Sequence, residues 1–140
     1  MPQAGKAALL DTNVILRFLL GDDAVHSPRA TSLMKRLESR AEVADLEDSV
    51  LAETVWVLQR GAKVPRLEIV RSLGRVVGLA GLRYLGGKRV LLDALASYGA
   101  THCDIVDCLL AARAKSRGSK VYSFDSTDFK RLKCAWREPG

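Results

Sequence analysis

The chain has 140 residues, the length of one domain with its own hydrophobic core, and we expect a single domain over residues 1–140. Its three cysteines are odd in number and lack paired spacing, so we interpret them as small buried hydrophobes in a reducing compartment, not as a disulfide framework or zinc site. The net charge of +6 favours binding of a polyanionic partner, but the ordinary surface charge that keeps a protein soluble would also explain it. Charged residues interrupt the apolar stretch near the N-terminus, so we expect no signal peptide, no membrane contact and a cytoplasmic protein.

Apolar strand-like runs alternate with helical patterns along the chain, which is typical of an α/β fold with a parallel sheet. In chain order we expect a strand at 7–10, helices at 12–20 and 27–40, a strand at 42–46, helices at 49–60 and 66–78, a strand at 82–85, helices at 88–98 and 104–117, and a strand at 119–124. Gly21 and Gly61 supply stop signals, while Ser27 and Ser49 are the expected N-caps of their helices.

Four acids lie at the ends or edges of these elements. Asp11 follows the first strand and Asp125 follows the last, and we expect both of these strands to be buried. Ligands of open α/β sheets bind at the carboxyl ends of strands, where these two acids lie. Glu53 borders the apolar face of its helix, and Asp107 lies in a helix that is apolar nearly all round. Carboxylates ~4 Å apart repel by about 4 kcal/mol at an effective dielectric of ~20, so such a cluster needs a proton or a cation. Oxygen ligands favour Mg²⁺ or Mn²⁺.

Each acid also has a purely structural explanation. Asp11 and Asp125 could cap a helix or start a turn, and Glu53 could be a solvated boundary residue. We expect Asp104 to be the N-cap of its helix, whereas Asp107 is a second acid in a buried helix and needs compensation, which favours a site. Asp128 could be an outer member of the cluster or the cap of the following segment.

Four segments together resemble the PIN-domain ribonucleases, and among them the VapC-type toxins of toxin–antitoxin pairs: residues 11–13, 51–58, 104–112 and 123–129. The resemblance covers nearly the whole chain, with the segments in the family's order. It implies a three-layer α/β/α sandwich with a small central parallel sheet, an Mg²⁺- or Mn²⁺-dependent endoribonuclease, a homodimer, and inhibition by a partner antitoxin.

Carried over by position, the resemblance assigns Asp11, Glu53, Asp107 and Asp125 to an acidic quartet. We expect Asp11, Asp107 and Asp125 to hold one or two metal ions and Glu53 to complete the shell or position water. Attack by metal-activated water would leave 5′-phosphate and 3′-hydroxyl ends on the RNA. It makes Asn13 and Ser123 supporting polar residues, and Asp104 and Asp128 variable acids that can join the site. We expect basic residues at the rim to contact RNA: Arg17, Lys88, Arg89, Arg113, Lys115 and Lys130. Aromatic residues are only 6% of the chain, so extensive base stacking is not expected. His26 and His102 are interpreted as surface or packing residues.

Two other classes of function stay open at this point. The fold could serve as a non-catalytic module that binds RNA or protein, with its acids acting as helix caps. A metal-dependent phosphatase is disfavoured because the position two residues after Asp11, where a second aspartate is usual, is Asn13. DNA cleavage also remains open, since carboxylate and metal chemistry do not select the sugar.

Overall fold

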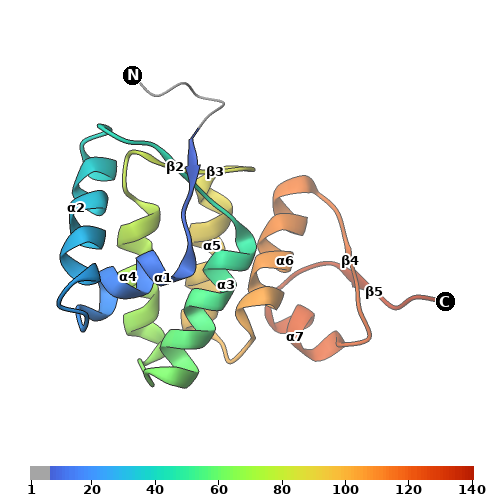
Figure 1. Cartoon of the computed structure of the whole chain (residues 1–140). Coiled ribbons are helices and arrows are strands. Elements are labelled where there is room, and N and C mark those ends of the chain that lie inside the picture. The colour runs from blue at the N-terminus through green and yellow to red at the C-terminus, as the bar shows by residue number, and fades with distance from the viewer. Residues whose placement is uncertain (1–6) are drawn as a thin grey trace. The chain divides into compact units, whose positions relative to one another are not determined.

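The computed structural model describes residues 7–140 and divides into two compact units (Figure 1). One unit comprises the described residues up to Lys88, and the other comprises those from Arg89 onward. The expectation about a leader at residues 1–6 lies outside the described residues, and the single domain stays a prediction. None of the helices within residues 7–140 combines the length and the apolar character that crossing a membrane requires.

The first unit contains a three-stranded parallel sheet in the order β1-β2-β3. Its strands are β1 (Ala8–Leu9), β2 (Ala44–Leu46) and β3 (Leu82–Tyr84). Successive parallel strands must be joined by long crossovers, and helices supply both of them here. In the register, Asp45 of β2 faces Arg83 of β3, and the Arg83 guanidinium donates to both carboxylate oxygens of Asp45 at 2.7 and 3.0 Å.

The helices of this unit lie below and to one side of the sheet in the view of Figure 1. They are α1 (Thr12–Leu20), α2 (His26–Glu38), α3 (Asp48–Trp56), the π-helical segment η2 (Val57–Gly61) and α4 (Arg66–Val77). Helix α1 packs against both α2 and α3 and ends at Gly21, whose φ of 61° is the left-handed conformation that glycine tolerates best. The core includes the fully buried side chains of Ile15, Leu37, Leu51, Ile69 and Leu73.

The second unit is built from α5 (Lys88–Ala100, beginning at the last residue of the first unit), α6 (Ile105–Arg117), β4 (Val121–Tyr122), α7 (Ser126–Arg131) and β5 (Trp136–Arg137). Strands β4 and β5 form a two-stranded parallel sheet. Tyr98, Ile105 and Phe129 are buried in its core. The three cysteines are free thiols in buried positions, as predicted: Cys103, Cys108 and Cys134.

These elements confirm the predicted α/β class with a small parallel sheet, but two details of the strands are wrong. The first and last predicted strands were expected to be buried, whereas Leu9 of β1 is 66% exposed and Tyr122 of β4 is 71% exposed. The physical reason is that each strand has two residues and pairs on one side, with β1 at the end of its sheet and β4 in a sheet of two.

The predicted N-caps at Ser27 and Ser49 are also wrong. Helix α2 begins at His26, because the Asp23 carboxylate accepts from the backbone N–H groups of Val25 and His26 at 3.0 and 2.7 Å. The Ser27 hydroxyl instead donates to the Arg17 carbonyl, which ties α2 to α1. Helix α3 begins at Asp48 and then widens into η2, where the Ala62 N–H donates to the Val57 carbonyl.

Candidate functional site

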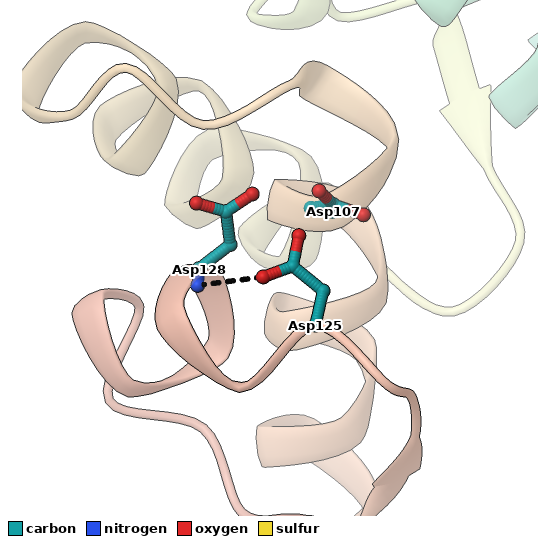
Figure 2. Close-up of side chains that lie close together, drawn as sticks. All are labelled: Asp107, Asp125 and Asp128. Atoms are coloured by element: carbon teal, nitrogen blue, oxygen red, sulfur yellow. Dashed lines mark hydrogen bonds between the residues drawn. The ribbon is translucent and has the colours of Figure 1, made fainter.

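Three aspartates of the second unit lie together at the start of α6 and of α7 (Figure 2). Asp107, Asp125 and Asp128 each present a carboxylate oxygen within 4.8 Å of the oxygens of the other two. Asp107 and Asp128 are half-buried, while Asp125 is exposed. The cluster therefore joins two acids of the predicted quartet with the acid that the sequence left as an outer member or a cap.

Backbone and hydroxyl groups fix the α7 side of this cluster. Asp125 is the N-cap of α7, and its carboxylate accepts from the Asp128 N–H at 3.2 Å, the dashed line in Figure 2. The Asp125 N–H in turn donates to the Ser123 hydroxyl at 2.9 Å. Two positions predicted separately, a turn aspartate and a supporting serine, thus form one continuous set of hydrogen bonds at the end of β4.

Asp107 lies in the first turn of α6, where Asp104 is the N-cap and its carboxylate accepts from the Val106 N–H at 3.1 Å. This geometry confirms the prediction that Asp104 caps the helix. It also leaves the Asp104 carboxylate outside the group of three acids, although it is near enough to act electrostatically on Asp107.

The charged form of Asp107 is disfavoured in this setting. Burial raises the pKa of the Asp107 carboxyl, and the neighbouring charges of Asp128, Asp104 and Asp125 raise it further, in that order. The positive charge of a cation between these oxygens would favour the ionised carboxylate and so offset both effects. Because every donor is a hard carboxylate oxygen, the residues present fit Mg²⁺ or Mn²⁺, the ions expected from the sequence.

The other two acids of the quartet belong to the first unit. Asp11 is the N-cap residue of α1 by its backbone angles, yet its side chain makes no capping hydrogen bond. Glu53 is exposed on α3, the helix that packs against α1. Among residues 7–140, neither carboxylate has a hydrogen-bond or ion-pair partner, so the purely structural explanation of Asp11 as a side-chain cap is not realised.

The predicted basic residues differ in how their charges are used. Arg17 pairs with Asp22 and Asp23, and Arg89 pairs with Asp93. The ammonium groups of Lys88 and Lys115 donate to the carbonyls of Leu79 and Leu132, and burial lowers the pKa of Lys88. Lys130 lies 5.9 Å from the centre of the Trp136 ring, and Arg113 is half-buried. RNA contact by these six residues stays a prediction.

A basic groove of the first unit was missed at the sequence level. It lies between α1 and α2, has a volume of about 610 Å³, and includes Asn13, Arg17, His26, Arg29 and Arg36 in its lining. A signal was present in the sequence, because basic residues recur on one face of α2 at helical spacing. Its importance depends on α1 lying alongside that face, which only the packing reveals.

The chain matches the PIN domain family over residues 8–133. It is also 27% identical to a VapC ribonuclease of Aquifex aeolicus (strain VF5) over 124 residues, which cover 89% of this chain and 90% of that protein. Both findings confirm the resemblance seen in the sequence, and the family match confirms the predicted three-layer α/β/α class. Because the match extends over most of its length, the chain belongs to the PIN domain family.

Proposed function

We propose that this chain is a metal-dependent endoribonuclease and the toxin of a VapC-type toxin–antitoxin pair. The observation that carries the proposal is the group of three carboxylates within 4.8 Å, in a chain of the PIN domain family. Structural capping accounts for Asp125, but it does not account for the half-buried Asp107, whose ionisation its neighbours oppose. A cation-binding role explains why these acids are gathered.

In this proposal Asp107 and Asp125 hold Mg²⁺ or Mn²⁺ together with Asp128, and Asp11 and Glu53 complete the same catalytic centre. When bound, such an ion lowers the pKa of water and neutralises charge that develops on the phosphodiester. The assignment of Asp11 and Glu53 is supported by their carboxylates, which have no other partner among the described residues.

The protein's own groups prepare this centre. Ser123 and the Asp128 N–H hold Asp125 in one orientation, so little side-chain freedom is lost when a ligand binds. Asp104 fixes the first turn of α6 and adds negative charge near Asp107. Asn13, in the first turn of α1, is proposed to support Asp11.

The partners follow from the same family. We propose an RNA substrate, a cognate antitoxin that covers the acidic centre, a homodimer and a cytoplasmic location. The VapC ribonuclease relative and the basic composition support the first two of these.

The test is cleavage of a pool of structured RNAs with Mn²⁺, with EDTA, and by the Asp107→Asn variant, followed by end-group analysis. We expect cuts that need Mn²⁺, carry 5′-phosphate ends, and fall at least ~100-fold in the variant, because losing one charged ligand weakens both metal binding and charge neutralisation. Asp93→Asn is the matched control, since Asp93 is an exposed acid of the same unit whose one ion-pair partner within residues 7–140 is Arg89 on its own helix.

Two outcomes would contradict the proposal. Cyclic phosphate products would mean that the RNA 2′-hydroxyl, and not water, is the nucleophile. Metal-independent RNA binding without cleavage, unchanged in Asp107→Asn, would favour the non-catalytic module.

A further inference from the structure

The groove between α1 and α2 has a distinctive lining. Apolar side chains of Val14, Ala30 and Leu33 contribute to it, and the polar contributors are Asn13, Arg17, His26, Arg29, Ser32 and Arg36. Of the residues that the structure describes, no acid lines it, although Asp22, Asp23 and Glu42 are close by in the sequence or in space. A concave surface with three arginines and no lining acid attracts anions.

The α2 side chains that carry positive charge in the groove share one face of that helix. His26, Arg29, Leu33 and Arg36 are separated by three, four and three residues, the spacing that places side chains above one another along a helix. Arg29 and Arg36 are therefore about 10 Å apart along the axis, from a rise of ~1.5 Å per residue. Such a row suits an extended polyanion better than a single small anion.

The groove arginines can exchange their present carboxylate partners for phosphate groups. Arg17 pairs with Asp22 at 3.3 Å and, at the longer distance of 3.8 Å, with the less exposed Asp23, while Arg36 pairs with Glu42 at 2.6 Å. The Arg17–Asp22 and Arg36–Glu42 pairs are about half exposed to solvent. Exposed ion pairs contribute little stability, so a phosphate can replace the carboxylate at small cost. Arg29 is exposed and has no hydrogen-bond or ion-pair partner among residues 7–140.

The groove begins beside a residue of the proposed catalytic centre. Asn13, which lines it, lies two positions after Asp11 in the first turn of α1, and Arg17 lies one turn further along the same helix. A strand of RNA whose scissile phosphate is near Asp11 can therefore run its neighbouring phosphates along Arg17 and the arginines of α2.

We propose that the groove between α1 and α2 binds the phosphate backbone of single-stranded RNA, through Arg17, Arg29 and Arg36. This inference rests on the proposed function, because it supplies the substrate contacts of that nuclease. Among the described residues, no Phe, Tyr or Trp side chain lines the groove, so recognition there rests mainly on the charge of the RNA backbone. Guanidinium groups suit this role because their paired N–H donors match phosphate oxygens.

The experiment measures binding of a short, labelled single-stranded RNA by fluorescence anisotropy in EDTA, so that no cleavage is needed. The groove variant is Arg29→Gln with Arg36→Gln. The control is Arg71→Gln with Arg75→Gln, which removes the same charge from two exposed positions of α4 in the same unit. Each phosphate contact of a single strand contributes about −0.7 to the slope of log affinity against log salt, so two lost contacts weaken binding ~25-fold at ~0.1 M salt and reduce the slope by ~1.4.

A loss confined to the groove variant supports the proposal. Equal losses in both variants, or none in either, overturn it. Unchanged RNA affinity with lost binding of poly-glutamate by the groove variant also overturns it and makes an acidic protein segment the occupant. The cleavage assay with Mn²⁺ is separate, so a protein that cuts RNA equally well with or without the groove arginines keeps the nuclease and loses the groove.

Discussion

Asp107 illustrates how opposing effects on one residue are resolved. The amide groups and macrodipole at the start of α6 favour a negative charge there by roughly 0.3–1 kcal/mol. The pKa of Asp107 is nevertheless raised, because burial and three neighbouring aspartates outweigh that stabilisation. A first-turn acid placed only for helix stability would not be expected to gather like charges around itself.

This conflict predicts that divalent cations stabilise the folded chain through the cluster of three aspartates. At Mn²⁺ concentrations ~100-fold above the dissociation constant, the free energy of unfolding should rise by about 2.7 kcal/mol, which raises the melting temperature by roughly 5–10 °C for a chain of this size. Asp125→Asn should remove most of that rise, because it deletes one charged ligand without deleting the N-cap acceptor. Thermal unfolding with and without Mn²⁺ measures both.

The control for this measurement is Asp93→Asn, which should respond to Mn²⁺ as the unmodified chain does. An equal rise in all three proteins would place cation binding outside the cluster, and no rise in the unmodified chain would contradict the metal site.

At the scale of elements, the connection between α2, β2 and β3 depends on one close backbone approach. Gly81 is buried, its N–H donates to the Leu37 carbonyl at 2.7 Å, and its own carbonyl accepts from the Ala44 N–H at 3.0 Å. A Cβ at this position would lie 2.7 Å from the Leu37 carbonyl oxygen and closer still to that of Glu42. These are backbone atoms of other elements, so they cannot turn aside as a flexible side chain can.

Gly81→Ala should therefore lower the free energy of unfolding by about 1–3 kcal/mol, the usual effect of overpacking. Gly74→Ala is the matched control, because Gly74 lies inside α4 with no atom within 4 Å of the added Cβ. That control should stabilise the chain by up to about 1 kcal/mol through helix propensity. Urea unfolding curves of both variants compare the two effects, and equal changes of the same sign would refute the packing argument.

The elements also show which features the sequence could predict. Helix α4 follows Pro65 and α1 ends at Gly21, so local chemistry was enough to place them. The start of α2 was misplaced because the Asp23 side chain reaches forward to His26, an interaction that competes with the Ser27 signal. The exposure of β1 depends on its place at the end of the sheet, which no local pattern encodes.

The same distinction holds for the candidate site across the whole molecule. Asp107 and Asp125, which the structure brings together, could be singled out from the ends of their own elements, because strand ends and helix starts have local signals. That Asp128 joins Asp107 and Asp125 could not, since it depends on how α7 turns back towards α6. The groove between α1 and α2 was likewise hidden, because its arginines are distributed over two helices and resemble ordinary solvated charges in the sequence.

The distribution of charge over the whole molecule leads to the last prediction. The net charge is +6 although several acids are gathered in one cluster, so the remaining surface is more basic than the total indicates. If the three groove arginines each neutralise one phosphate, RNA affinity should fall ~20-fold between ~50 and ~200 mM salt, from a slope of about −2.1. Anisotropy titrations over that range measure the slope. An oligomer with an uncharged methylphosphonate backbone should bind weakly and without this dependence, whereas a flat profile for RNA itself would mean that phosphates do not direct binding.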